Sequence, residues 1–361
     1  MKVAVIGAGI VGLSTANWLK RYGQDVTLFD REDPGSQASF GNAGTYAKYA
    51  NIPTNSSSFF YLFPYLLLNK NSPLFFKRGK FIQSLPWLMQ YLSNCRQSKV
   101  KDTSNKLTTL LSLVDEGYED LFNDADIENL ISRESIFYVW SNKLFYNSAR
   151  KDFETREKTG VKIEIISKNE INDVEPNINN IFYKGALFKG SYFAKNPKKI
   201  SEKLLQLFIE KGGNFKKEKI EEIKILDTNK VNIHTNENTY IYDRIVLCAG
   251  VWSKKLTDKL GENIPLASER GYHLMYPHPE NSISRPIAWQ ERGVYFTPMQ
   301  DGLRAGGVVE LGGNSNEISS KVVTYLKRAT KAVFPNINNH LSEWVGFRPS
   351  VPDSLPVIGQ S

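Results

Sequence analysis

The chain has 361 residues, 41% of them hydrophobic and 23% charged, which is the composition of a folded globular protein with room for two domains. Its 46 basic and 38 acidic residues give a net charge of +8, but the lysines are scattered and no nucleic-acid recognition motif is present, so we expect a solvated basic surface and no nucleic-acid partner. The two cysteines and four histidines match no metal or redox spacing, so we expect no metal centre and a reducing, cytoplasmic compartment.

The first predicted elements form a βαβ unit. The sequence predicts a strand over Lys2–Ile6, a helix over Ile10–Arg21 and a second strand over Asp25–Phe29, which runs into Asp30. The apolar N-terminal run superficially resembles a signal peptide, but glycines interrupt it, and we interpret it as part of the fold. No stretch of about 20 continuous apolar residues follows, so no transmembrane helix is predicted.

The rest of the chain mixes helices and short strands. Residues 51–190 are rich in Phe, Tyr, Leu and Pro, and a helix is predicted there from about Leu107 to Phe122. Further predicted elements are a helix at Lys198–Lys211, strands at Ile220–Ile225, Val231–Thr235 and Ile245–Leu247, a β-rich stretch at Ile287–Val309, and a helix at Ser319–Val333. This order predicts an α/β protein in which separated pieces form a nucleotide-binding domain and a mixed second domain is inserted between them.

A glycine-rich turn, Gly7-Ala8-Gly9-Ile10-Val11-Gly12, joins the first strand to the first helix. In this context Gly7 permits the tight turn, Gly9 lets the backbone approach a pyrophosphate, and Gly12 lets the helix pack on the sheet. The helix N-terminus offers free N–H groups and a positive dipole end to phosphates. The alternative is a glycine-rich turn that binds no ligand.

Asp30 follows the second strand at the position that accepts hydrogen bonds from ribose hydroxyls. A carboxylate there repels a 2′-phosphate, which leaves NAD and FAD as the candidate dinucleotides. The βαβ unit alone does not choose between them, so the choice depends on the rest of the chain.

Several later segments make that choice through a resemblance that extends over essentially the whole chain. They are Ser39–Gly44, Asp243–Ser253, Val345–Pro349 with Pro352-Asp353 and Pro356–Gly359, Tyr295–Met299 with Gly302–Arg304, and Pro73–Phe75 with Leu85–Leu88. Together with the glycine turn they resemble the D-amino-acid oxidase superfamily of FAD-dependent amine oxidoreductases. Within it, the chain is most similar to bacterial D-amino-acid dehydrogenases.

The resemblance implies a non-covalent FAD and a Rossmann-like FAD-binding domain with an inserted, mixed antiparallel-sheet substrate domain. The implied boundaries are 1–50, 195–262 and 341–361 for the FAD-binding domain, and 51–194 and 263–340 for the substrate domain. The residues implied to hold FAD are Gly7, Gly9, Ile10, Val11, Gly12, Asp30, Arg31, Ser39, Asn42, Ala43, Gly44, Ile220, Ala249 and Gly250. A polar turn at Ser39–Gly44, and a strand end that only needs small residues at Ala249-Gly250, are the alternatives.

Two residues are candidates for the catalytic site. Arg348 matches the arginine of the family's G-x-R-P segment, and its planar fork suits the α-carboxylate of an amino acid. Tyr272 is a second candidate for the pocket lining, with a core or surface aromatic as the alternative. His273 is expected to be structural or exposed. A structural salt bridge is the alternative for Arg348.

The implied reaction is oxidation of a D-amino acid to a 2-oxo acid and ammonia, with hydride transfer from Cα to flavin N5 and electrons passed to a membrane or quinone acceptor. Glycine, sarcosine, proline or hydroxyproline are alternative substrates, and a non-catalytic flavin-binding subunit is another alternative. Family members continue beyond the segment at Pro356–Gly359, so a missing C-terminal part is expected. The oligomeric state stays open.

Residues 58–92 combine aromatic side chains with Lys70, Lys77, Arg78 and Lys80. This pattern predicts a surface that lies on an anionic bilayer without spanning it, at the inner face of the cell membrane. The alternative is an ordinary aromatic core segment of the second domain.

Overall fold

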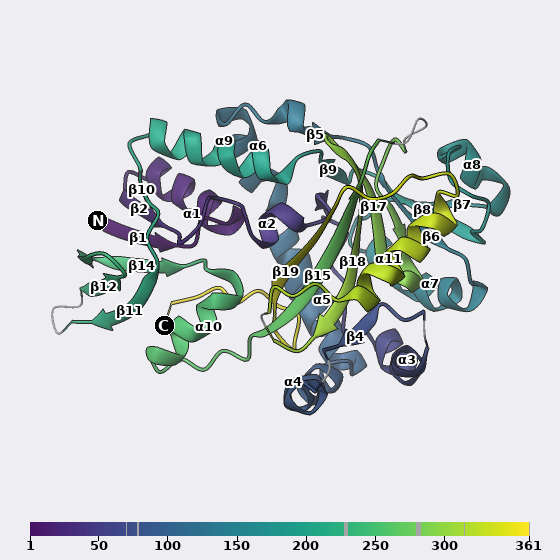
Figure 1. Ribbon diagram of the computed structural model, residues 1–361, viewed down its shortest axis with the longest axis horizontal. Helices are drawn as coiled ribbons and strands as arrows, with labels where there is room; N and C mark the ends of the chain where they lie inside the picture. Colours follow the sequence, from purple (N-terminus) through teal and green to yellow (C-terminus); the bar gives the residue numbers. More distant parts are fainter. Residues whose placement is uncertain (70, 78, 227–229, 279–282, 314, 361) are drawn as a thin grey trace.

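The computed structural model describes residues 1–361 apart from 70, 78, 227–229, 279–282, 314 and 361. A parallel sheet near the N-terminus and a large mixed sheet lie beside each other along the longest axis (Figure 1). The chain enters the parallel sheet, crosses to the large sheet, returns, and crosses again. Lys70 and Arg78, which the predicted membrane surface includes, lie outside the described residues.

The parallel sheet has the order β10-β2-β1-β14, formed by Asn214–Lys216, Asp25–Phe29, Lys2–Ile6 and Arg244–Leu247. The elements that cover it are α1 (Ile10–Arg21), α9 (Pro197–Glu210), β11 (Ile220–Ile225), β12 (Val231–Thr235) and β13 (Thr239–Tyr242). Val5 and Leu28 pack against the two helices, whereas Ile6 and Phe29 pack against the antiparallel β11-β12-β13 sheet. Because both faces are covered, the two central strands β1 and β2 are mostly apolar.

The large sheet has the order β19-β15-β18-β17-β16-β6-β8-β7, with a short strand β4 paired to the end of β18. Its strands are Ser342–Ser350, Ala267–Tyr276, Gly302–Leu311, Val294–Met299, Ile287–Trp289, Ile136–Trp140, Lys184–Phe188 and Ile163–Ile166 in that order, and Leu74–Phe76 for β4.

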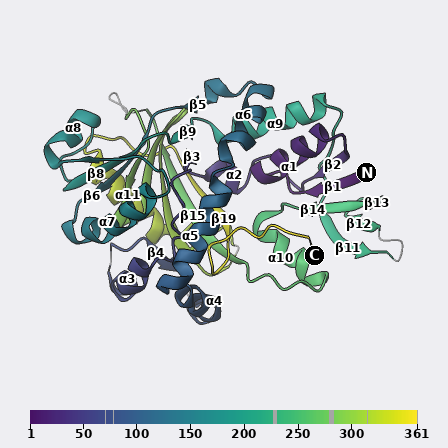
Figure 2. The same ribbon diagram turned by 180° about the vertical axis from the view of Figure 1, so that it is seen from behind.

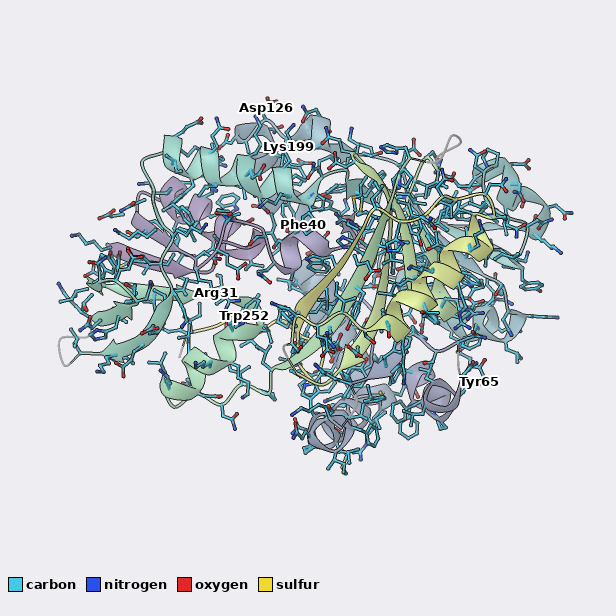
Figure 3. The ribbon with its side chains drawn as sticks, viewed as in Figure 1. Arg31, Phe40, Tyr65, Asp126, Lys199 and Trp252 are labelled. Atoms are coloured by element: carbon cyan, nitrogen blue, oxygen red, sulfur yellow. The ribbon has the colours of Figure 1, made fainter. Side chains whose placement is uncertain are left out.

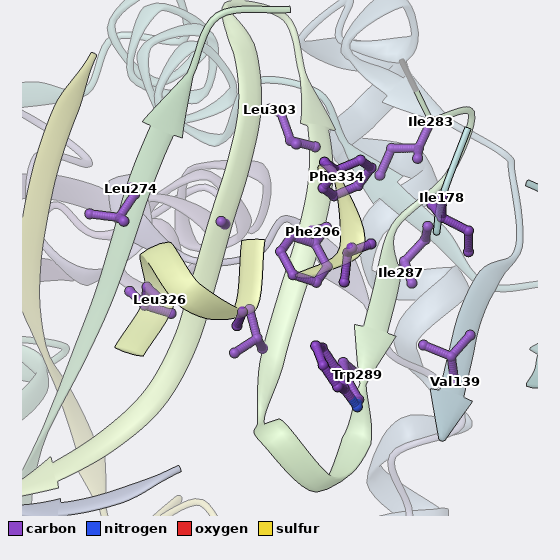
Figure 4. Packing of buried hydrophobic residues seen from close by; sticks show 14 of the residues in the cluster. Val139, Ile178, Leu274, Ile283, Ile287, Trp289, Phe296, Leu303, Leu326 and Phe334 are labelled. Carbon is purple, nitrogen blue, oxygen red and sulfur yellow. The ribbon is translucent and has the colours of Figure 1, made fainter. Parts of the chain in front are cut away.

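One face of this sheet is covered by α11 (Ser320–Val333), whose apolar residues recur every three or four positions. Leu326 and Phe334, from the helix and the turn after it, pack with Leu274 and Phe296 from the strands (Figure 4). Burial of a leucine such as Leu326 stabilises the fold by about 2 kcal/mol.

The remaining elements connect and flank the two sheets. A small sheet has the order β3-β9-β5, formed by Thr45–Tyr46, Tyr192–Ala194 and Ile131–Ser132. The other helices are α2 (Ala38–Gly41), α3 (Ser57–Leu68), α4 (Phe81–Ser93), α5 (Gln97–Leu111), α6 (Val114–Asp124), α7 (Lys143–Glu157), α8 (Ile171–Val174) and α10 (Ser253–Lys259), with single turns at Glu128–Leu130, Lys168–Glu170, Gly250–Trp252 and Gln290–Arg292. Seen from behind, α5 runs along the side of the molecule opposite α11 (Figure 2). Within the part of the chain that the structure describes, none of the helices has the length and hydrophobicity needed to cross a bilayer.

The predicted α/β class and the opening βαβ unit are confirmed, with the same strand and helix bounds. The single helix predicted from Leu107 to Phe122 is wrong, because the chain turns at Ser112-Leu113 and forms α5 and α6. The Ser112 hydroxyl donates to the Thr109 carbonyl at 2.8 Å, and acidic residues fill the first turn of α6, where the helix dipole favours them. The domain boundaries stay a prediction; β19, which they place in the FAD-binding part, is hydrogen-bonded to β15 in the large sheet.

Candidate active site

The glycine-rich turn lies between β1 and α1, at the carboxyl end of the parallel sheet. Gly7 has φ +108°, and a Cβ atom there would lie 2.4 Å from the carbonyl oxygen of Cys248. A Cβ atom on Gly12 would lie 1.7 Å from the carbonyl oxygen of Gly7. Both positions therefore require glycine. At the start of α1, Gly9 provides no capping side chain, and the apolar side chain of Val11 is 63% exposed.

Asp30 stands beside this turn at the end of β2. Its carboxylate accepts the backbone N–H of Ala8 at 2.6 Å and that of Glu32 at 3.0 Å. Burial raises the pKa of Asp30, and the two backbone hydrogen bonds oppose that rise. The neighbouring Arg31 guanidinium lies over the ring of Trp252 at 4.2 Å (Figure 3).

The strand ends bring most of the predicted cofactor residues together. The Cys248 N–H donates to the Ile6 carbonyl at 2.8 Å, which places Ala249 and Gly250 directly beside the turn. Ser39 reaches the turn from α2, where its hydroxyl accepts the N–H of Ile10 at 2.9 Å. Ile220 packs over the other face of the sheet, in the same cluster as Phe29.

The loop after α2 carries Asn42, Ala43 and Gly44. Asn42 closes it locally, because its side chain donates to the Ser39 carbonyl at 2.8 Å and accepts the N–H of Gly44 at 2.7 Å. A cavity of about 210 Å³ opens beside it, lined by Ile10, Ser39, Asn42, Ala43, Gly44, Thr45, Tyr46, Tyr118, Ala194, Pro197, Ile200 and Ser201. The loop thus connects the phosphate-binding turn with the large sheet.

Two buried basic side chains from the large sheet, Arg304 and His273, hold this loop, and neither was predicted from the sequence to be a site residue. Arg304 donates to the carbonyls of Phe40 at 2.8 Å and Asn42 at 2.7 Å. His273 Nδ1 lies 3.1 Å from the Gly41 carbonyl oxygen, and its ring stacks on Trp344 at 5.0 Å. The sequence showed Arg304 only within a segment of family resemblance, and nothing in it distinguishes a buried arginine from an exposed one.

These residues fit a bound FAD. Gly7 and Gly12 allow the tight turn, Gly9 brings no side chain to the start of α1, and the Asp30 carboxylate lies at the end of the second strand. The exposed Val11 stands at that helix end, where a dinucleotide would cover it. Among the described residues, no group of three His, Cys, Asp or Glu side chains forms a metal site.

A second cavity of about 480 Å³ begins at the same loop and extends over the large sheet toward α3 and α4. Its lining is mostly apolar and aromatic, with three charged side chains. It is lined by Gly41, Asn42, Ala43, Thr45, Thr54, Phe59, Leu66, Pro73, Leu74, Trp87, Leu88, Tyr91, Glu269, Gly293, Tyr295, Arg304, Gly306, Gly307, Val308, Val309, Leu311 and Arg348. A mostly apolar cavity with a few placed polar groups is the usual form of a small-molecule site.

Arg348 lines this cavity from β19. Its guanidinium reaches across Gly271 of β15 and donates to the carbonyls of Val308 at 3.1 Å and Gly307 at 3.4 Å on β18. Those carbonyls belong to a β-bulge, where Gly307 has φ +138° and Val308 has φ +54°. The desolvation by surrounding protein lowers the pKa of Arg348, and the negative charge of Glu269 opposes that change.

Gly271 makes room for this arginine, and we expect Gly271→Ala to impair the site. A Cβ atom there would lie 2.7 Å from Arg348 Nη2 and 2.8 Å from Cζ, so the guanidinium must move. We expect kcat/KM to fall about 10- to 100-fold with flavin content unchanged, since a shift of about 1 Å in a binding group has effects of this size. Steady-state kinetics on the purified variant measure this; an unchanged kcat/KM would show that Arg348 needs no free space over Gly271.

Tyr272 does not line the cavity, which corrects the expectation from the sequence. Successive residues of a strand point to opposite faces, and Tyr272 points to the α11 face while Gly271 and His273 point to the cavity face. Its hydroxyl donates to Glu310 at 2.5 Å, and Glu310 also binds the buried Arg270. Tyr272 is therefore a core residue in a polar network beneath the sheet.

His273 makes stability depend on pH. Burial, with a smaller effect of the Arg304 charge, lowers the pKa of His273 to about 3. The unfolded chain binds a proton below about pH 6.5 that the folded chain binds only near pH 3, so its stability contribution is complete above pH 6.5 and declines as the pH falls. We expect this residue to lower the free energy of unfolding by about 2 kcal/mol between pH 7 and pH 5. Urea unfolding of wild type and His273→Asn measures it, and equal pH slopes would contradict the assignment.

Comparisons with known proteins bear on the whole chain. A family model described as FAD dependent oxidoreductase (DAO) matches residues 2–361. The chain belongs to this FAD-dependent oxidoreductase family. A D-amino-acid oxidase of Bradyrhizobium diazoefficiens is 28% identical over 367 residues, covering 99% of this chain and 87% of that protein.

Two solved structures of the family resemble the fold closely. Glycine oxidase from Geobacillus kaustophilus superposes with a TM-score of 0.76 at 18% identity, over 99% of this chain and 85% of that one. L-proline dehydrogenase from P. horikoshii superposes with a TM-score of 0.73 at 15% identity, over 100% of this chain and 84% of that one. The predicted superfamily, α/β FAD-binding fold and FAD cofactor are thereby confirmed.

Proposed function

We propose that this protein oxidises a D-amino acid to the 2-imino acid, which water converts to the 2-oxo acid and ammonia. The observation that carries the proposal is the position of Arg348, whose guanidinium lies in the large cavity that begins at the loop Gly41–Thr45. The planar guanidinium of an arginine can bind a carboxylate through two hydrogen bonds, so an arginine in a mostly apolar cavity suits a substrate with one carboxylate. When bound, FAD supplies the acceptor for the hydride that leaves Cα.

The chain's own residues have three tasks in this proposal. The cofactor would be held by Gly7, Gly9, Ile10, Val11, Gly12, Asp30, Arg31, Ser39, Asn42, Ala43, Gly44, Ile220, Ala249 and Gly250. Arg348 binds the α-carboxylate and so fixes which substrate carbon faces the loop. Arg304 and His273 are positioning residues, because they hold the loop through the backbone carbonyls of Gly41 and its neighbours.

The nature of the amine is the finer part of the proposal. A D-amino acid fits the relative from Bradyrhizobium, which is a D-amino-acid oxidase, while glycine, sarcosine, proline and hydroxyproline are the competing substrates. Incubation of the FAD-loaded protein with an artificial electron acceptor and each compound tests this, by measuring reduction of the acceptor for every compound and formation of 2-oxo acid and ammonia for the primary amines. Product from D-alanine but not L-alanine supports the proposal. Product from sarcosine or proline alone would replace the substrate class and keep the anchor role of Arg348.

A non-catalytic flavin-binding subunit is the alternative of a different class. A protein of that kind would keep its FAD and form no product with any of these amines. The visible spectrum shows whether FAD is bound, and the product assay shows whether an amine is oxidised. Together they distinguish the enzyme from the flavin-binding subunit.

We also propose that α4 contributes to a surface on the cytoplasmic face of the membrane, where a quinone would accept the electrons. Ile82 and Met89 of α4 are 78% and 69% exposed, and Lys77 and Lys80 lie just before the helix. Apolar side chains beside cations suit an anionic bilayer surface.

Flotation with vesicles tests the membrane proposal. The purified protein is expected to co-migrate with vesicles that contain anionic lipid at low salt, and Ile82→Ser with Met89→Ser is expected to weaken this. Absence of wild-type protein from the vesicle fraction would contradict the proposal. Rapid oxygen consumption during turnover would favour an oxidase instead.

A further inference from the structure

The large cavity contains a carboxyl group that the proposed reaction does not use. Among the described residues that line it, Glu269 alone is acidic. Glu269 lies directly opposite Arg348 in the β15-β19 ladder, and opposed side chains on one face of a sheet are close neighbours. Ser350 also hydrogen-bonds its carboxylate.

The order of residues along β15 places Glu269 at the end of the cavity far from the cofactor loop. His273, Gly271 and Glu269 point to the same face, and such positions are about 7 Å apart along a strand. His273 contacts the carbonyl of Gly41 in the loop, and Gly271 lies beneath the Arg348 guanidinium. A substrate held by its carboxylate at Arg348 therefore has its reacting carbon on the loop side, and Glu269 is reached only by a long side chain.

The far end of the cavity suits a cation. Trp87 and Tyr91 of α4 stack at 5.3 Å and line the cavity there, and Phe59 packs edge-on against Tyr91. The Trp87 N–H donates to the carbonyl of Pro265, close before β15, which fixes that ring near Glu269. Aromatic rings beside a carboxylate attract organic cations.

The charges in the cavity favour the same class of ligand. In the free site the positive charge of Arg348 lies opposite Glu269 on the neighbouring strand. Burial raises the pKa of Glu269, and the charge of Arg348 opposes that rise. A substrate carboxylate that binds Arg348 neutralises the positive charge of the arginine. The negative charge of Glu269 is then left without a cation to balance it. A second cation on the substrate restores the balance, whereas a neutral side chain leaves a poorly solvated carboxylate.

We propose that Glu269 determines specificity by binding a cationic group at the end of the substrate side chain, so that the preferred substrates are basic amino acids. This inference rests on the proposed function, because it assumes that the α-carboxylate binds at Arg348. D-Lysine and D-norleucine form the matched substrate pair, since they differ only in the terminal ammonium group.

Anaerobic reduction of the bound flavin by these two amino acids gives the first test. We expect wild type to reduce at least about tenfold faster with D-lysine than with D-norleucine at limiting concentration. In Glu269→Gln, the D-lysine rate constant should fall about 10- to 100-fold while that for D-norleucine changes less than about threefold. Glu262→Gln, an exposed carboxyl substitution, is the control. Equal losses for both amino acids would overturn the inference, because Glu269 would then bind the α-amino group or act only through Arg348.

Binding of a compound that lacks an α-amino group separates this inference from the proposed function. Dissociation constants for 6-aminohexanoate and hexanoate, measured on the FAD-loaded protein through the flavin spectrum, need no turnover. We expect 6-aminohexanoate to bind about tenfold more tightly in wild type and equally in Glu269→Gln. If no amino acid reduces the flavin but this preference is present, the proposed reaction fails and the cation site stands. If wild type binds 6-aminohexanoate and hexanoate equally well, the cation site is refuted.

Discussion

Replacing Arg348 with methionine is expected to lower kcat/KM for the amino acid substrate by about 30- to 5000-fold, the range seen when one partner of a hydrogen-bonded charge pair is removed. The flavin content should not change, because Arg348 contacts the carbonyls of Gly307 and Val308 and none of the residues of the phosphate-binding turn. Steady-state assays with an artificial acceptor, together with the visible spectrum of each preparation, measure both quantities.

Two further variants sharpen this result. Arg348→Lys keeps the charge but loses the planar fork, so we expect a smaller loss, mainly in KM. Arg328→Met, an exposed substitution on α11, controls for the loss of one surface charge and should behave as wild type. If Arg348→Met retained the wild-type KM, the α-carboxylate would have to bind elsewhere in the cavity.

The second large effect is expected at the dinucleotide turn. In Gly12→Ala the new methyl group would lie 1.7 Å from the Gly7 carbonyl oxygen, so α1 must move away from β1. We expect a loss of about 3 kcal/mol in the free energy of unfolding, at the upper end for an overpacked site, and a colourless protein. FAD binding is measured by the flavin absorbance that remains after incubation with FAD and removal of the free cofactor by dialysis. The free energy of unfolding is measured separately by urea unfolding of the apoprotein.

Gly117→Ala is the matched control for that substitution. Gly117 lies inside α6, and a Cβ atom there meets no atom within 4 Å apart from its chain neighbours and the nearby backbone of its own helix. The same chemical change should therefore leave FAD binding intact and raise the stability by about 0.5–1 kcal/mol, since alanine favours a helix. A Gly12→Ala protein that kept its FAD would show that the turn has more freedom than its packing indicates.

The parts of the fold that the sequence predicts are those in which local pattern and tertiary environment agree. The strands of Val3–Ile6 and Val26–Phe29 are apolar apart from Thr27, because helices cover one face and a second sheet covers the other. The glycines of the turn could be assigned in advance, because no other residue fits where the backbones of Gly7, Gly12 and Cys248 meet. Arg348 became a candidate through the family's G-x-R-P segment.

The rest depends on contacts between distant segments. The face of β15 to which Tyr272 points is set by pairing with β18 and β19, and adjacent residues such as Tyr272 and His273 have opposite environments. The positive φ of Val308, whose carbonyl binds Arg348, carries no sequence signal because valine rarely adopts it. Glu269 became a candidate only after the sheet placed it opposite Arg348.

The visible spectrum of the purified protein, recorded anaerobically before and after addition of D-alanine and D-lysine, tests the central claim most directly. We expect flavin absorption bands that are bleached by at least one of the two D-amino acids, while the protein stays folded and keeps its FAD. Bands that persist after addition of both D-amino acids would contradict the proposed reaction. A protein that stays colourless after incubation with FAD would contradict the assignment of the cofactor site in this chain.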